Sequence, residues 1–195
     1  MRKSLVIVLA AATLTFSLTA CGNKANNEPS KVEDQQVAIT DSLELLNNVW
    51  AGYADEEKFP AAGGDFSEEN NTMDAPGVYS IEDAEAVDYA LGFPAADIDK
   101  IDGAASLTHM MNANTFTCGA YHVKDSKDID AVAADIKENI MSRQWMCGFP
   151  DKLVVANVGD YLVAFFGKNE TMDTFQNKLT DAYPSVTIIS EDTIE

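Results

Sequence analysis

Apolar residues recur at i, i+3 and i+4 spacing, the periodicity of an amphipathic helix, in several separate segments of the chain. Helices are expected over residues 42–50, 81–91, 127–144 and 170–183. Asp41 or Thr40 is the expected N-cap of the first helix. Ser80 and Asp125 precede the next two and have the same capping chemistry. Pro184 would end the last helix, because proline cannot donate the next backbone hydrogen bond.

Runs of β-branched and aromatic residues between turn residues predict strands. The expected strands are residues 104–111, 116–123, 153–157, 161–167 and 186–189. The first two flank Asn112-Ala113-Asn114 and should pair as a hairpin. The acidic segment 55–77 is interpreted as a long loop, because it contains Gly-Gly, Asn-Asn and Pro-Gly pairs. Residues 190–195 are interpreted as an acidic tail.

The order of these elements predicts an α+β fold with an antiparallel sheet and two helices on one face. From residue 115 onward the order is β-α-β-β-α-β, the ferredoxin-like pattern, so a core of that type is expected over about 115–190. An extra N-terminal strand and the two N-terminal helices would be added to this core. No sequence repeat accompanies the symmetry of the pattern.

The N-terminal residues have the plan of a secretory signal peptide. Arg2 and Lys3 precede an uncharged, apolar stretch that ends in small residues. The sequence Leu18-Thr19-Ala20-Cys21-Gly22 resembles the lipobox cut by lipoprotein signal peptidase. That resemblance implies that residues 1–20 are removed and that the Cys21 thiol receives a diacylglyceryl group. An ordinary signal peptide or an uncleaved N-terminal helix is the alternative.

A lipidated Cys21 would place the protein at the outer, extracytoplasmic side of the cell membrane. Anchoring by two acyl chains, such as palmitate, is stable, whereas one chain binds a bilayer only marginally. Residues 21–36 are polar and are expected to form a flexible tether. Residues 37–195 would then form a single extracytoplasmic domain, which is long enough to bury a core.

The strong negative charge narrows the classes of partner. The formal net charge is -19, and no cluster of Lys and Arg exists, which argues against nucleic acid and against a domain lying on anionic lipid. From Asp55 to Asp102 the only bases are Lys58 and Lys100. This segment is either a solubilising surface or a surface for divalent cations such as calcium. Residues 97–103 do not fit an EF-hand loop, because the ligand register fails.

Cysteine and histidine offer little catalytic chemistry. Cys118 and Cys147 either form a disulfide in the oxidising extracytoplasmic space or stay reduced and buried. His122 lies in an expected strand, and His109 precedes two methionines that are either copper ligands or core side chains. No catalytic residue, metal site or cofactor is therefore predicted. A hydrolase that uses paired carboxylates is a further hypothesis, though chance alone supplies pairs among 32 acids.

Two short motifs carry a family resemblance over roughly residues 95–190. Residues 143–150, Arg-Gln-Trp-Met-Cys-Gly-Phe-Pro, are followed by residues 158–163, Val-Gly-Asp-Tyr-Leu-Val. Together they resemble a family of small lipoproteins common in Firmicutes, especially gut Clostridia, whose C-terminal domain is of unknown function. The resemblance implies a cellular location and a fold, but it implies no activity, ligand or catalytic residue.

The same motifs supply the candidate partner surface. Arg143, Trp145, Phe149 and Tyr161 bring one planar cation and three aromatic rings into the loop-bearing part of the pattern. They form either a recognition patch or a helix end pinned to a loop by an ion pair. The function expected is a non-catalytic binding or accessory module for an envelope protein or a small ligand. A calcium-binding surface protein is the alternative, and a hydrolase is the hypothesis that the sequence favours least.

Overall fold

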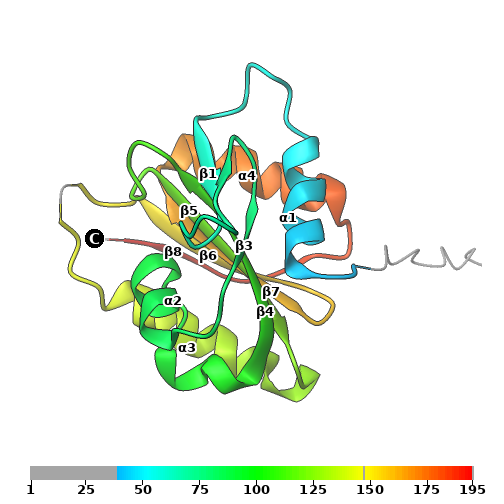
Figure 1. Cartoon of the computed structure of the whole chain (residues 1–195), viewed down its shortest axis with the longest axis vertical. Helices are drawn as coiled ribbons and strands as arrows, with labels where there is room; N and C mark the ends of the chain where they lie inside the picture. The colour runs from blue at the N-terminus through cyan, green and yellow to red at the C-terminus, as the bar shows by residue number, and fades with distance from the viewer. Residues whose placement is uncertain (1–38, 147, 195) are drawn as a thin grey trace, which may run out of the picture. The chain divides into compact units, whose positions relative to one another are not determined.

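The computed structural model describes residues 39–146 and 148–194. The predicted signal peptide, Cys21 and the tether lie outside the described residues, as does Cys147. In chain order the elements are α1 (Ser42–Ala51), β1 (Ala61–Gly63), β2 (Thr72–Met73), β3 (Gly77–Tyr79), α2 (Ala84–Leu91), the 3-10 helix η1 (Ala95–Lys100), β4 (Ile101–His109), β5 (Phe116–Val123), the 3-10 helix η2 (Ser126–Asp128), α3 (Ile129–Met141), β6 (Lys152–Val158), β7 (Tyr161–Gly167), α4 (Asn169–Ala182) and β8 (Thr187–Thr193) (Figure 1).

The strands form one antiparallel sheet, in the order β2-β1-β4-β5-β7-β6-β8, with β3 also paired to β4. The short strands β1 and β3 share the outer edge of β4: β1 pairs with Thr108 and His109, and β3 pairs with residues 104–106. The hairpin expected over 104–123 is confirmed as β4 and β5. The α+β class and the antiparallel sheet are confirmed as well.

The helices cover both faces of the sheet, which corrects the expectation of two helices on one face (Figure 1). In a ferredoxin-like core the last strand would pair with β5, but β4 occupies that edge and β8 pairs with β6 instead. The chain crosses from β5 through α3 to β6, and later from β7 through α4 to β8. Both crossovers move toward the same edge of the sheet, but they start from β5 and β7, which are antiparallel. Because such crossovers are right-handed, their helices lie on opposite faces. The ferredoxin-like topology is thus not confirmed.

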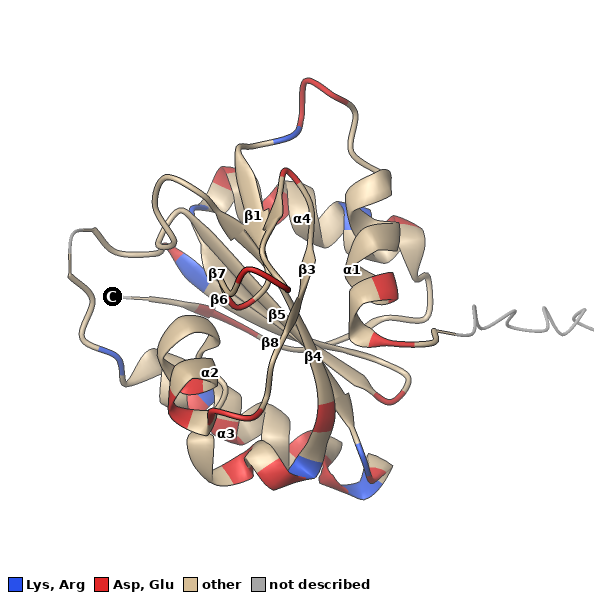
Figure 2. Ribbon diagram, in the orientation of Figure 1, with Lys and Arg blue, Asp and Glu red and all other residues tan. Residues whose placement is uncertain are grey.

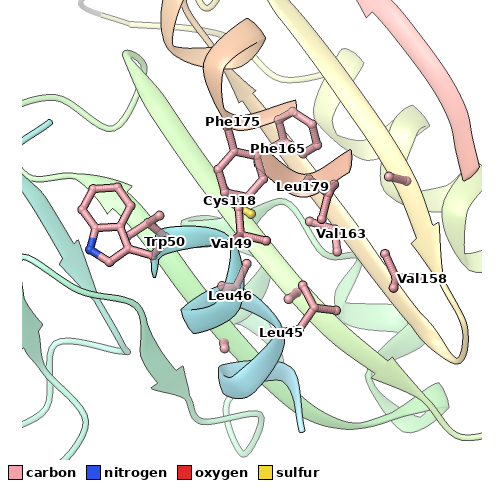
Figure 3. Close-up of a cluster of buried hydrophobic side chains, with 14 of the residues drawn as sticks. Leu45, Leu46, Val49, Trp50, Cys118, Val158, Val163, Phe165, Phe175 and Leu179 are labelled. Atoms are coloured by element: carbon pink, nitrogen blue, oxygen red, sulfur yellow. The ribbon is translucent and has the colours of Figure 1, made fainter. Parts of the chain in front are cut away.

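Two hydrophobic cores follow from this arrangement, one on each face. All seven residues of β7 are buried, because alternate side chains point into different cores. Val163 and Phe165 contact the core under α1 and α4, while Leu162 and Phe166 contact the core under α2 and α3. Figure 3 shows the first core, where Phe165 lies among the helical side chains of α1 and α4.

Helix starts depend on which side chain caps the backbone. Asp41 accepts a hydrogen bond from the Glu44 amide at 2.7 Å, which confirms it as the N-cap of α1. The second helix begins later than expected, at Ala84, because Asp83 rather than Ser80 accepts from the Ala86 amide. The third helix ends at Met141, so residues 142–146 lie outside it, without regular secondary structure.

The segment interpreted as a long acidic loop contains the strands β1 and β2 and ends at Gly77, where β3 begins. Its glycines permit close contact between backbones: a Cβ on Gly63 would lie 2.2 Å from the backbone nitrogen of Gly77. The expectation of an acidic tail was also wrong, since β8 continues through residues 190–193. Within the described ranges, no helix is both long and apolar enough to cross a bilayer.

Candidate binding groove

A groove of about 670 Å³ opens on the sheet face that α2 and α3 cover, where those helices stop. Its lining comes from α2, from the segment that follows α3, from the loop after β1, and from β4, β7 and the β4–β5 turn. A cavity of this size suits a small molecule or a few side chains of a partner.

The groove floor is made of small hydroxyl side chains at strand positions that are apolar elsewhere on this face. Ser106 and Thr108 on β4 line the groove, whereas Ala104, two residues earlier, packs into the core under the helices. The Ser106 hydroxyl accepts from the Gly64 amide at 2.9 Å and donates to the Gly64 carbonyl at 3.1 Å. This buried pair of hydrogen bonds fixes the loop after β1 to the floor.

Helix α2 forms one wall. Glu85 and Tyr89 are four residues apart, so they are neighbours on one side of this helix. The Tyr89 side chain is 88% exposed. An aromatic ring that exposed contributes little to the stability of the domain, but it is available to a ligand.

The segment after α3 forms the opposite wall, and Arg143 joins it to α2. The Arg143 guanidinium donates to the Asp88 carbonyl and lies 3.4 Å from the Asp88 carboxylate. Asn139 on α3 also donates to that carboxylate, at 2.8 Å, and to the Gly92 carbonyl at 3.0 Å. Arg143 therefore neutralises Asp88 and joins the segment after α3 to helix α2, whereas the pinned helix end was expected to be held to a loop.

Trp145 and Met146 complete this wall. The Trp145 ring packs on Phe166, with 5.2 Å between ring centroids. Its indole N–H is buried and has no hydrogen-bond partner in the described part of the chain. Met146 is 80% exposed, and Asn114 at the β4–β5 turn donates to its carbonyl at 3.1 Å.

Phe66 forms the third side of the groove and has an unusual backbone. Its φ angle is 63°, in the left-handed region that bulky residues rarely adopt, and its side chain is 63% exposed. The neighbouring Asp65 holds this conformation by accepting from the Ser67 and Ser80 amides and from the Asn70 side chain. Desolvation would raise the pKa of Asp65, but these hydrogen bonds outweigh it and lower the pKa to about 2.

The structure brings together only part of the predicted partner surface. Arg143 and Trp145 line the groove, and Phe149 lies exposed further along the same segment without lining it. Tyr161 is not part of this surface. It lies at the start of β7, is 6% exposed, and packs on His122.

Sequence reasoning missed Phe66, Glu85 and Tyr89. Phe66 lies in a segment interpreted as a loop, where no periodicity marks it. Tyr89 was detectable in principle, since it is a large aromatic residue at a polar position of the α2 pattern.

The residues considered for catalysis are engaged elsewhere. His122 lies 2.5 Å from the Asp102 carboxylate, at the sheet end away from the groove. His109 stacks on Phe59, and its Nδ1 accepts from the Met111 amide. In residues 39–146 and 148–194, no group of three or more His, Cys, Asp or Glu side chains is placed to hold a metal ion.

Cys118 is fully buried in the core under α1 and α4, and this burial raises the pKa of its thiol (Figure 3). Its candidate disulfide partner, Cys147, lies outside the described residues, so the bridge stays a prediction. Comparison with models of known protein families, with curated proteins and with solved structures found no match.

Proposed function

We propose that this chain is a lipid-anchored, extracytoplasmic binding module that holds a partner in the groove between α2 and residues 143–146. The observation that carries the proposal is the ring of exposed apolar side chains at the groove. Phe66, Tyr89 and Met146 are 63%, 88% and 80% exposed and all line it. Apolar side chains that gather around a cavity mark binding sites more reliably than scattered ones.

The rigidity of the groove supports the same proposal. Ser106 fixes the loop after β1, Asp65 fixes the backbone of Phe66, and Arg143 fixes the opposite wall to α2. A left-handed backbone at a phenylalanine costs on the order of 1 kcal/mol or more and persists only where the surroundings impose it. A preformed site loses less conformational entropy when it binds.

The chemistry of the groove favours binding over catalysis. Its charged lining consists of Glu85, Asp88 and Arg143, and the last two neutralise each other. Glu85 alone does not make the pair of carboxylates that glycoside hydrolysis uses. The proposed extracytoplasmic location depends on the resemblance of residues 18–22 to a lipobox. We also propose that the chain is related to the clostridial lipoproteins, a relationship that implies no activity.

Site-specific photo-cross-linking in living cells tests the proposal. A photoreactive phenylalanine analogue would replace Tyr89 at the groove or, as the matched control, the exposed Asn177 on α4, beneath the other face of the sheet. Irradiation should join a reproducible partner to the protein from position 89 and not from position 177. Mass spectrometry would identify that partner.

The substitution Trp145→Leu should lower the yield of the cross-link at position 89, while Phe149→Leu, outside the groove, should leave it unchanged. A melting curve for each variant would show that the fold is intact. Identical cross-link patterns from positions 89 and 177 would mean that no partner binds specifically at the groove, and the proposal would fail.

A further inference from the structure

The groove keeps one uncompensated negative charge after its Arg143–Asp88 ion pair is taken into account. Arg143 is the only basic side chain in the described lining, and it is occupied by Asp88. Glu85, in the first turn of α2, has no ion-pair partner among the described residues. Figure 2 shows further acidic residues on α2 and the segment before it. The groove therefore carries a net negative charge that a cationic ligand would neutralise.

The aromatic ring next to Glu85 suits the same ligand. Tyr89 lies one helical turn further along α2, so a carboxylate and an exposed ring stand side by side at the rim. A Lys or Arg side chain is attracted by both, through charge and through the electron-rich ring face. The formal net charge of -19 also raises the concentration of cationic ligands near the domain and repels anionic ones.

The rest of the groove suits the remainder of a peptide. Phe66, Trp145 and Met146 offer apolar surface to an aliphatic or aromatic side chain. Thr108 and Gln144 add a hydroxyl and an amide to the lining, and such groups bond peptide N–H and C=O groups. An uncharged ligand would cover Glu85 without replacing its lost hydration, which is costly for a carboxylate.

We infer that the groove binds a cationic peptide segment, in which a Lys or Arg side chain lies beside Glu85 and Tyr89. The neighbouring aliphatic or aromatic side chain enters the apolar part of the groove. This inference rests on the proposed function, and it adds the chemistry of the partner.

Selection from a random library of twelve-residue peptides displayed on phage tests the inference and does not require the natural partner. The chain from residue 21 onward, made with Cys21→Ser so that it stays in solution, would be the target, and the same chain with Tyr89→Ser/Met146→Ser would be the control. Both substituted side chains are highly exposed, so the control should fold normally. Peptides that carry Lys or Arg next to an aromatic or aliphatic residue should be enriched on the wild type only.

Glu85→Gln and Glu170→Gln form the matched pair of charge variants. Both glutamates are exposed and lie in the first turn of a helix, but Glu170 is on α4 and the opposite face. Glu85→Gln should weaken binding of a selected peptide about three- to ten-fold, while Glu170→Gln should change it little. Added salt should reduce the difference between wild type and Glu85→Gln.

Two results would overturn the inference. One is a selection in which the wild type enriches uncharged or acidic peptides, or enriches only peptides that the control variant also enriches. The other is equal affinity of the wild type and Glu85→Gln for the enriched peptides. A partner cross-linked from position 89 in cells would, in either case, leave the proposed function standing with a ligand of different chemistry.

Discussion

Single residues shape the groove by overriding the local preference of the backbone. Asp65 is the clearest case, because one carboxylate gathers hydrogen bonds from Ser67, Asn70 and Ser80 and leaves Phe66 in a left-handed conformation at the rim. The stability that Asp65 contributes should therefore depend on its charge.

Replacing Asp65 by Asn should lower the free energy of unfolding at neutral pH by about 1–2 kcal/mol. The pKa of Asp65 falls from 3.8 to about 2 on folding, so its contribution is complete above pH 3.8 and is lost as the pH falls through about 2. Urea unfolding at a series of pH values measures this. The difference between wild type and variant should shrink as the solution is acidified.

Asp55→Asn is the control for that experiment, since its side chain is 99% exposed. It should change stability little at any pH. A difference between wild type and Asp65→Asn that stays constant from neutral pH to about pH 2 would show that the charge of Asp65 is not what stabilises the loop.

The sequence allowed part of the groove to be predicted, and the reason is local. Arg143 and Trp145 follow a helix directly and stay with it, so their proximity needed only secondary structure. Tyr161 was misplaced because strand register decides which end of a sheet a residue occupies, and here β7 pairs it with His122. Phe66 depends on hydrogen bonds from residues distant along the chain, such as Ser80, which no periodicity records.

At the scale of elements, the short strands β1 and β3 position the loop that carries Phe66: the loop follows β1, and Ser80, just after β3, donates to its Asp65. The two strands approach each other so closely that both need glycine, and a strand of two or three residues leaves no alternating pattern to detect. The longer elements were predictable because each has a repeated apolar face, as Val132 and Ile136 show on α3.

Gly63→Ala should destabilise the domain by about 2–4 kcal/mol, since the new Cβ would meet three backbone atoms within 2.6 Å and backbone cannot move aside cheaply. Gly103→Ala is the matched control, where the nearest atom to the new Cβ is 3.8 Å away. Chemical denaturation of both variants measures the effect. Equal stability of the two would contradict the close approach of β1 and β3.

The topology escaped prediction because it depends on competition for one sheet edge. A β-α-β-β-α-β order is compatible with the last strand at either edge of the core. The hairpin of β4 and β5 occupies the edge beside β5, so β8 pairs with β6. The placement of α4 on the face opposite α3 follows from that single displacement.

At the scale of the whole molecule, the proposed anchor and the proposed site make separate predictions. Cys21→Ser should abolish incorporation of radiolabelled palmitate and move the protein from the detergent phase to the aqueous phase in a detergent-partition assay. Cys147→Ser should leave both properties unchanged. The lipoprotein hypothesis would be excluded if the wild-type chain did not incorporate the labelled palmitate, or if the Cys21→Ser chain stayed in the detergent phase.

Strand β7 also has a practical consequence for attaching the domain to a surface. Its first residue, Tyr161, donates through its hydroxyl to the carbonyl of Ile39, while Phe166 lies at the groove. About 16 Å of strand separates Tyr161 from Phe166, at roughly 3.3 Å per residue.

The C-terminal end of the described chain lies closer to the groove. The Ile194 amide donates to the Asp151 carbonyl, and the Asp151 amide donates to the carbonyl of Gly167, next to the groove. A bead, sensor chip or fusion partner joined ahead of Ile39 would leave the groove open to solution, whereas the same attachment beyond Ile194 would crowd it.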